Sequence, residues 1–522
     1  MNVNQKSIFY VFLLSVFLAL PSMAASTKIE AESAQYVNCK LISNSKYSGG
    51  KALELTESNA RITFTFTADV REKYIIHVGY DGLYGQKVVN LAVNGNNSTF
   101  NVNGQSESVV GTYIMEAKAN SIVITPNWTW FRIDYIILER DNSNLEFNIS
   151  PTPVDKDATA TALAMYTFLY DNFGKKTLSG IMTGDLSNSY GNVTRQADVK
   201  AVYQASGKYP ALIGFDFMNA TGKSENDSWM KEYTRECINL CKDTYLRGGV
   251  PAFTWHWRDP SRATDAFYTS ESNMKISNAL NSDGSWNTQS TLYKYIIHDI
   301  DLVADYFLEL QKENIAVVFR PLHEASGGWF WWGREGAAPF IKLYHLVFDE
   351  MVNVKGVHNV IWVWNAGEND KDWNPGDEYY DVVSADIYNS DFDYSSNYVT
   401  FNSLKVLTGG KKIIALSENG PIPDIEKEVE DDAVWSWWMP WYQTWNGKFV
   451  DKTSAAEWKK CMSDPRVITL DEMNEGWQPT AIDETVSDMA ENQEVYDLQG
   501  RPFSSIPDRG LFIMGGRVVI KR

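Results

Sequence analysis

The sequence predicts an α/β fold, a (β/α)8 TIM barrel preceded by an all-β sandwich domain and followed by a short C-terminal tail of β type. In the first part of the chain, apolar and polar residues alternate over short runs separated by Gly, Asn and Asp turns, a pattern typical of β-sandwiches. From about residue 160, runs that are apolar on both faces alternate with amphipathic stretches, which indicates buried parallel strands joined by helices. The 522 residues are sufficient for two or three domains.

Residues 1–25 are predicted to be a signal peptide. Lys6 precedes the short apolar run IFYVFLLSVFLAL, and PSMAAS then offers small residues for cleavage near Ala24 or Ala25. This apolar run is too short to span a bilayer comfortably. We therefore expect a secreted or cell-surface protein without membrane insertion.

The composition restricts the partners that the protein can bind. The formal net charge is −19 and no basic block interrupts it, which argues against nucleic acid and anionic membranes. The chain has 19 Trp, and such flat amphipathic side chains are suited to stacking on a ligand such as a neutral polysaccharide. The four Cys form neither a disulfide framework nor a metal signature. We expect a monomer.

Residues 26–140 are predicted to form the β-sandwich, with strands in ARITFTFTA, KYIIHVGY and VVNLAVNG. The segment resembles carbohydrate-binding modules of family 35 or family 6 in the runs IEAESA, YSGGKAL, VNG and WFRIDYIIL. The resemblance implies a structural calcium ion held by Glu30, Glu32 and Asp134, whose carboxylate oxygens are ligands that calcium prefers. The alternative is that these three are solvated acids at strand ends.

Trp128 and Trp130 lie in a turn beside the last predicted strand of this module. Because alternate residues on a strand point the same way, the two indoles could form one sugar-stacking face. They could equally pack in the core of the module.

Residues 141–159 are polar, contain two prolines and are predicted to be a linker. Residues 160–477 are predicted to form the barrel. Its eight strands are expected in KTLSGIM, PALIGFDF, VPAFTWHW, NIAVVFRP, NVIWVWNA, DVVSADIY, KIIALSEN and AVWSWWMPW. Polar residues gather at the C-terminal ends of these runs, which is where barrel enzymes carry their chemistry.

Residues 478–522 form the predicted tail, first acidic and then strand-like. Its runs YDLQGR, GLFIM and VVIKR resemble the C-terminal sorting domain of proteins exported by certain Bacteroidota. That resemblance implies an address rather than a part of the enzyme. The alternative is a small β-appendage packed on the barrel.

Two glutamates stand at the ends of two predicted strands. Glu324 follows AVVFRP on the fourth strand, among aromatic residues whose desolvation raises the pKa of a carboxyl, as a general acid requires. Glu418 closes KKIIALSEN on the seventh strand. Strands four and seven lie across the mouth of an eight-stranded barrel, so both carboxyls can flank one substrate. A pair of carboxyls around a glycosidic bond is the minimum that glycoside hydrolysis needs.

The stretches FRPLHEASGGWFWWG and ALSENG resemble the catalytic motifs of glycoside hydrolase family 26, chiefly endo-β-1,4-mannanases. The likeness covers about residues 157–478, and TWHWRDP, WVWNAG and SADIYN support it in order. It implies a retaining enzyme that cleaves internal bonds of mannan, galactomannan or glucomannan by double displacement without a cofactor. Glu324 would be the acid/base and Glu418 the nucleophile. The chain departs from many members in having Ala325 and Ser326 after the acid.

The same resemblance implies a set of substrate-binding residues around this pair. Arg320 would orient carboxylates through its planar guanidinium, His323 would shape the subsite around the sugar's 2-hydroxyl, and Tyr388 would hydrogen-bond the nucleophile. Two residues would line the subsite of the reacting sugar and two indoles would stack on sugar rings: Asp386, His256, Trp329 and Trp441.

Competing functions are less well supported by the sequence. A zinc site of the HExxH kind would need a second His where Gly327 stands, and no G-x-S-x-G elbow for a serine hydrolase occurs. A β-1,3-1,4-glucanase or β-1,3-xylanase of the same family, or a non-catalytic polysaccharide-binding protein, remains as an alternative.

Overall fold

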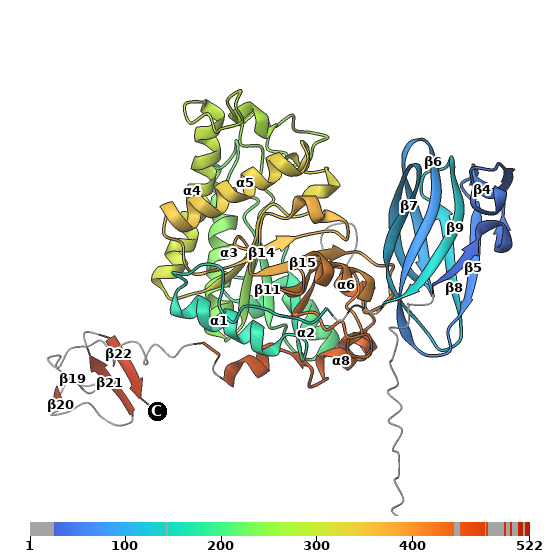
Figure 1. The fold of residues 1–522 in the computed structure, drawn as a ribbon. Helices are drawn as coiled ribbons and strands as arrows, with labels where there is room; N and C mark the ends of the chain where they lie inside the picture. The colour runs from blue at the N-terminus through green and yellow to red at the C-terminus, as the bar shows by residue number, and fades with distance from the viewer. Residues whose placement is uncertain are drawn as a thin grey trace, which may run out of the picture. The chain divides into compact units, whose positions relative to one another are not determined.

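The computed structural model describes residues 26–141, 143, 145–442, 449–475 and 477–478, and four short strands between residues 495 and 521 (Figure 1). The predicted signal peptide, residues 1–25, lies outside the described residues. The chain divides into two compact units, residues 1–144 and 145–522.

The first unit is an antiparallel β domain, as predicted. A 22-residue strand, β6, pairs with β9 from Tyr74 to Asp81 and with β8 from Val89 to Val93, so it joins the two faces of the fold. Buried and exposed residues alternate along β8. The nine strands are β1 (Thr27–Glu30), β2 (Gln35–Val37), β3 (Lys40–Ser43), β4 (Lys51–Leu55), β5 (Arg61–Thr67), β6 (Glu72–Val93), β7 (Asn96–Met115), β8 (Ala119–Pro126) and β9 (Phe131–Arg140).

The second unit contains a closed barrel of eight parallel strands, and each strand falls within one of the eight predicted runs. The pairing runs from β11 to β17 in sequence order, and β10 closes the ring by pairing with both β17 and β11. The strands are β10 (Thr177–Met182), β11 (Leu212–Asp216), β12 (Val250–Thr254), β13 (Val317–Arg320), β14 (Val360–Asn365), β15 (Val382–Ile387), β16 (Ile413–Asn419) and β17 (Trp437–Pro440).

Helices surround this ring (Figure 1). They are α1 (Ala160–Asn172), α2 (Ala197–Ser206), α3 (Ser228–Leu246), α4 (Thr291–Lys312), α5 (Ala337–Asp349), α6 (Tyr398–Leu407), α7 (Ile425–Glu430) and α8 (Ala455–Met462). A short strand, β18 (Val467–Ile468), adds to β10. The predicted fold class, a TIM barrel after an all-β domain, is therefore confirmed.

Large side chains fill the barrel interior, and two glycines make room for them. A Cβ at Gly180 would lie 2.5 Å from the carbonyl oxygen of Trp438. A Cβ at Gly214 would lie 2.6 Å from the sulfur atoms of Met182 and Met439. Because close-packed interiors do not yield easily, these strands depend on glycine at both positions. The packed interior makes the ends of the strands the place for a ligand.

Most of the predicted linker lies against the barrel. The backbone N–H of Asn148 donates to the carbonyl of Gly410 over 2.8 Å, and that of Val154 donates to Oδ1 of Asp381 over 2.7 Å. The Tyr166 hydroxyl donates to the Ser150 carbonyl over 2.7 Å. These bonds fix residues 148–154 of the predicted linker to the second unit.

The described strands of the tail form a four-stranded antiparallel sheet, which agrees with its predicted β type: β19 (Val495–Tyr496), β20 (Pro502–Phe503), β21 (Gly510–Met514) and β22 (Arg517–Lys521). All four cysteines lie in described parts of the chain and are free thiols. Among the helices that the structure describes, none combines the length and apolar character needed to cross a membrane.

Candidate active site

The barrel strands bring one set of polar side chains to a common edge, because the carboxyl ends of parallel strands meet there. Each of six strands ends within two residues of such a side chain: Asp216, His256, Arg320, Asn365, Asp386 and Glu418. Five of the six are buried, and the side chain of the sixth, Asp386, is 3% exposed. Buried polar groups are stable only when they are hydrogen-bonded, and these side chains bond mainly to one another.

Glu418 lies at the end of β16 and is 4% exposed. Its Oε1 accepts a hydrogen bond from Arg320, and its Oε2 accepts one from the Tyr388 hydroxyl over 2.5 Å. Nε2 of His323 lies 3.9 Å from Oε1. Two donors, one of them cationic, fix the orientation of this carboxylate. This is the arrangement that a nucleophile requires.

Arg320 binds two carboxylates at once. One nitrogen of its guanidinium donates to Glu418, and the other donates to Oδ2 of Asp386 over 2.7 Å. Oδ1 of Asp386 accepts from Nδ2 of Asn365 over 2.9 Å. The predicted role of Arg320 in orienting carboxylates agrees with these contacts. Asp386 lies beside the nucleophile, as expected for the subsite of the reacting sugar.

Glu324 follows β13 in a left-handed backbone conformation with φ 51°. Its backbone N–H donates to Oδ1 of Asn365 over 2.7 Å, and its Oε2 accepts from the indole N–H of Trp329 over 2.8 Å. Burial and the nearby charge of Glu418 raise the pKa of Glu324, while the bond from Trp329 opposes the rise. A carboxyl with a raised pKa is suited to protonate a leaving group.

The acids lie close enough to act on one bond. One carboxylate oxygen each from Glu324, Asp386 and Glu418 lie within 4.8 Å of one another. Retaining glycosidases hold their two carboxyl groups about 5 to 5.5 Å apart, whereas inverting enzymes need about 6.5 to 9.5 Å. The same spacing could suit a cation, but the guanidinium of Arg320 already binds two of the three acids.

Two histidines lie edge to face beside the acids. Nε2 of His256 is 3.2 Å from Nε2 of His323, and Nδ1 of His256 is 2.6 Å from Oδ2 of Asp216. Nδ1 of His323 lies 3.3 Å from Oγ1 of Thr254. Burial lowers the pKa of His323, and Arg320 adds to the effect. Burial also acts to lower the pKa of His256, but the charge of Asp216 outweighs it and the pKa is raised.

Only some of the predicted indoles face the cleft. Trp329 is 46% exposed, while its neighbours Trp331 and Trp332 are fully buried and donate to the carbonyls of Trp257 and His323. The run of three tryptophans is therefore one cleft residue and two core residues. A Cβ at Gly327 would lie 2.2 Å from the Trp329 ring, so glycine there allows this placement.

The eighth strand contributes Trp441, as predicted. Its ring lies 5.8 Å from that of His256, at the edge of the site. Trp437 and Trp438 are buried within the strand itself and are core residues. Tyr388 is about half exposed, with only its hydroxyl directed to Glu418.

The sequence did not single out Asp216, Thr254 or Asn365, although each contacts a predicted site residue. The signal that could have found Asp216 and Asn365 is the same one that found Glu418, a polar residue that closes an apolar strand. Tyr268 was also missed. It forms a β-bridge with Phe330, and its ring stacks on that of Phe330 at 5.3 Å. No local pattern marks a loop tyrosine of this kind.

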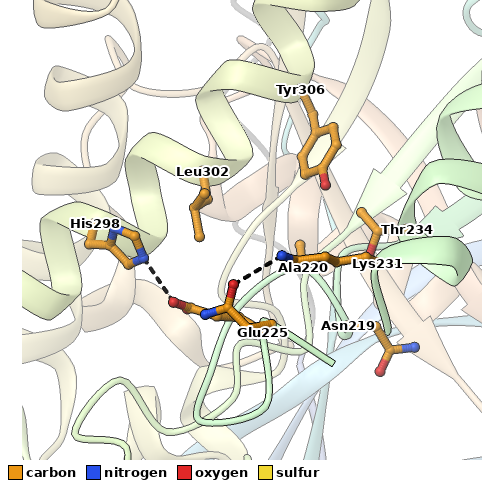
Figure 2. A pocket seen from close by; sticks show the side chains of 9 residues that line it. Asn219, Ala220, Glu225, Lys231, Thr234, His298, Leu302 and Tyr306 are labelled. Atoms are coloured by element: carbon orange, nitrogen blue, oxygen red, sulfur yellow. Dashed lines mark hydrogen bonds and ion pairs between the residues drawn. The ribbon is translucent and has the colours of Figure 1, made fainter. Parts of the chain in front are cut away.

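A second polar cluster lies outside this cleft, between α3 and α4 (Figure 2). Nε2 of His298 is 3.0 Å from Oε1 of Glu225, beside a cavity of 220 Å³. Arg262 forms ion pairs with both Glu225 and Asp299, at 2.7 and 2.6 Å. Because the arginine supplies the positive charge that these acids need, the cluster is an ion-pair network rather than a metal centre.

The three acids predicted to bind calcium lie together in the first unit. Asp134 accepts from the backbone N–H of Ser48 over 3.1 Å, and Glu30 accepts from the Ser48 hydroxyl over 2.7 Å. Glu32 Oε2, Glu30 Oε2 and Asp134 Oδ1 are buried without a hydrogen-bond partner. Burial raises the pKa of Asp134, and the charges of Glu30 and Glu32 add to the rise. Nζ of Lys28 lies 3.4 Å from Oε1 of Glu30, but the three unpaired oxygens have no such partner. Unpaired buried carboxylate oxygens fit a bound cation.

Trp128 and Trp130 lie in the loop between β8 and β9 and are 58% and 49% exposed. The alternative that they pack in the core is therefore wrong. Tyr84, in a break of the β6 pairing, is 82% exposed, and its ring lies 6.2 Å from that of Trp130. The first unit thus carries exposed aromatic rings from two segments, β6 and the loop between β8 and β9.

An eight-stranded barrel with two acids at the carboxyl ends of its strands, close enough to flank one bond, defines a barrel glycosidase. The comparisons agree with this class and give the family. Residues 154–472 match the model of glycosyl hydrolase family 26, and residues 27–141 match carbohydrate binding module family 35. The chain belongs to glycosyl hydrolase family 26, and members of this family need no cofactor for catalysis.

The relatives cover most of the chain. A mannan endo-1,4-beta-mannosidase of Thermothelomyces thermophilus is 32% identical over 483 residues, 88% of this chain and 92% of its own. The crystal structure of a Podospora anserina GH26-CBM35 beta-(1,4)-mannanase is 27% identical with a TM-score of 0.57, and covers 87% of this chain and 99% of that one. The crystal structure of a beta-mannanase from a symbiotic protist of the termite Reticulitermes speratus is 39% identical with a TM-score of 0.56. It covers 63% of this chain and 99% of that one.

Proposed function

We propose that this protein is an endo-β-1,4-mannanase that hydrolyses internal bonds of β-mannan with retention of configuration. Glu418 attacks the anomeric carbon while Glu324 gives its proton to the leaving glycosidic oxygen, which breaks the bond and forms a glycosyl-enzyme. Glu324, now ionised, takes a proton from water. The resulting hydroxide oxygen displaces Glu418 and releases the sugar.

The observation that carries this proposal is the short separation of the carboxylate oxygens of Glu324 and Glu418, within 4.8 Å. It supports retention, because an inverting enzyme needs room for a water between acid and base. The environments also differ as the two roles require. Glu418 accepts from Arg320 and Tyr388, while Glu324 accepts from the neutral indole of Trp329.

The relatives support mannan as the substrate class, since those named above act on mannan or are named mannanases. The test is to incubate the full chain with linear β-1,4-mannan, lichenan and β-1,3-xylan and to identify the products. Short manno-oligosaccharides from mannan alone are expected. Products from lichenan or xylan alone would place the enzyme with the β-1,3-1,4-glucanases or β-1,3-xylanases instead.

Glu418→Ala and Glu324→Ala separate catalysis from binding. Both should lose turnover while still binding mannan, and the anomer first released by the wild type should be β. An α-anomer would contradict retention. Absence of product from the wild type on all three polymers, with mannan still bound, would favour a non-catalytic binding protein.

We further propose that Glu30, Glu32 and Asp134 hold a structural calcium ion, supported by their three unpaired buried oxygens. When bound, the ion would neutralise these acids and tie β1 to β9. Addition of calcium to the metal-free full chain should raise the melting temperature of the first unit. Glu32→Gln should reduce that shift, and an unchanged melting temperature in the wild type would contradict the site.

Trp128 and Trp130 are proposed to bind mannan on the module and keep the enzyme on its polymer, which raises the local substrate concentration. Their exposure supports this role. Replacing both by Ala should weaken retention of the full chain on insoluble mannan while kcat on short oligosaccharides stays the same. Exposed Val109, which has no ring to stack, is a matched control for loss of apolar surface.

Export is proposed from the residue pattern of 1–25, and residues 478–522 are proposed as a sorting address. N-terminal sequencing of the mature protein should begin near residue 25 or 26, and removal of the tail should shift activity from the cell surface to the medium.

The protein is proposed to be a monomer, which light scattering of the purified chain tests directly.

A further inference from the structure

Asp216, at the end of β11, is a buried carboxylate that lies behind the predicted site. Its Oδ1 accepts from the backbone N–H groups of Met218 over 2.8 Å and His256 over 3.1 Å, and its Oδ2 lies 2.6 Å from Nδ1 of His256. Only 3% of Asp216 is exposed. Two backbone N–H groups and the ring of His256 surround this buried carboxyl, and a buried carboxylate is stable only beside a compensating charge.

The hydrogen bonds around His323 determine where its proton lies. The Thr254 hydroxyl donates to the carbonyl of Arg320 over 3.3 Å, so its oxygen accepts from Nδ1 of His323. A neutral His323 with its proton on Nδ1 presents a lone pair at Nε2. That atom lies 3.2 Å from Nε2 of His256, and two lone pairs cannot face each other at this distance. The proton between them then belongs to His256.

We propose that Asp216 is a positioning residue that keeps His256 doubly protonated, with Nδ1–H bonded to Asp216 and Nε2–H bonded to His323. The cleft beside Glu418 thereby carries a fixed imidazolium. Only the expected change in the pH profile of kcat/KM rests on the proposed function, because there the positive charge of His256 acts on the nucleophile of that reaction. The proton positions themselves do not depend on any substrate.

The charges around the pair agree with this assignment. The charge of Asp216 raises the pKa of His256 against the effect of burial, whereas burial and the positive groups lower that of His323. The titratable and charged groups that surround the two rings and Asp216 are Tyr233, Cys237, Arg258, Arg320, Glu324, Glu418 and Tyr442. Of these, the acids near His256 favour its cation and Arg320 disfavours it.

The direct test reads the imidazole nitrogens by NMR of the full chain labelled with ¹⁵N-histidine. The chain has six His, so the spectrum is small, and His256→Asn and His323→Asn assign the two signals. At pH 7 we expect both nitrogens of His256 to carry protons and His323 to carry one, on Nδ1. A neutral His256, or a His323 proton on Nε2, overturns the proposal.

Asp216→Asn tests the cause. His256 should become neutral at pH 7, whereas Asp259→Asn, a change at another buried carboxyl, should leave its signals unchanged. A doubly protonated His256 in Asp216→Asn would overturn the role of Asp216. If this variant does not fold, the wild-type proton positions still decide the proposal.

The kinetic readout is the pH profile of kcat/KM. Loss of the imidazolium removes a positive charge beside the nucleophile, so the acidic limb should move to higher pH by about 0.5 to 1 unit in Asp216→Asn. A structural defect would lower the whole profile without moving that limb, which would also contradict the proposal. Failure of mannan hydrolysis with the expected NMR signals would overturn the proposed function and leave the proton positions intact.

Discussion

The hydroxyl of Tyr388 donates a hydrogen bond to Oε2 of Glu418 over 2.5 Å, on the side of the carboxylate opposite to Arg320. A hydrogen bond to a charged group contributes about 1.5 to 3 kcal/mol. Tyr388→Phe should therefore lower kcat/KM on mannan by about 10- to 100-fold with little change in melting temperature.

Tyr394→Phe is the matched control for this change. The Tyr394 hydroxyl accepts from the backbone N–H of Ser454 over 2.9 Å, so the variant loses a tyrosine hydrogen bond away from the acids. It should keep the activity of the wild type. Equal losses in both variants would show that the Tyr388 hydroxyl does not act on the nucleophile.

Trp329 should lower the pKa of the catalytic acid Glu324. Its indole donates to Oε2 of Glu324, which favours the ionised form and works against the burial that raises the pKa of this carboxyl. Trp329→Phe keeps an aromatic ring but removes the N–H, so the pKa of Glu324 should rise further. The basic limb of the pH profile of kcat/KM, where the acid loses its proton, should move to higher pH. A basic limb at lower pH would contradict this reading of the bond.

The sequence predicted the barrel well because its strands are buried on both faces and cannot be mistaken for amphipathic elements. Glu324 and Glu418 were found because each closes such a strand. Asp216 and Asn365 also close strands, but a single polar residue in that position is as often structural as functional. Only the structure shows that Asn365 contacts both Glu324 and Asp386.

The directions of the tryptophan side chains could not be predicted from the sequence. Trp329, Trp331 and Trp332 stand within four positions, yet one faces the cleft and two lie in the core. The directions of the three side chains depend on two short 3-10 segments, Ala325–Gly327 and Trp331–Gly333. The side-chain periods of a strand or an α-helix do not apply to such segments. The predicted linker shows the same limit. Its polar residues and prolines suit a tether, while its backbone bonds to Gly410 and Asp381 are invisible in composition.

Arg320 should be needed for stability as well as catalysis. Arg320→Met would leave Asp386 and Glu418 buried without their cation, which typically costs about 3 to 5 kcal/mol. We expect a lower melting temperature at pH 7 and a partial recovery at lower pH, where protonation removes the unpaired charges. Circular dichroism melts from pH 4 to 7 measure this. A variant equally destabilised at every pH would indicate a packing defect instead.

Asp381 should make stability fall as pH rises, a direction opposite to that of a salt-bridged acid. Its two oxygens accept from the backbone N–H groups of Val154 and Trp362, and burial raises its pKa from 3.8 to about 6. Because the folded state holds the proton more tightly than the unfolded state, this group's contribution is complete below the unfolded pKa. It is lost as pH rises through the folded pKa.

The expected loss from Asp381 between pH 4 and 7 is at most about 3 kcal/mol. Asp381→Asn cannot ionise, so its free energy of unfolding, measured by urea at each pH, should fall less steeply over this window than that of the wild type. Asp377→Asn, at a half-exposed acid that pairs with Lys411, is the control and should keep the wild-type slope. If Asp381→Asn kept that slope as well, the carboxyl would titrate alike in the folded and unfolded states, and its burial behind Val154 would not govern the pH dependence.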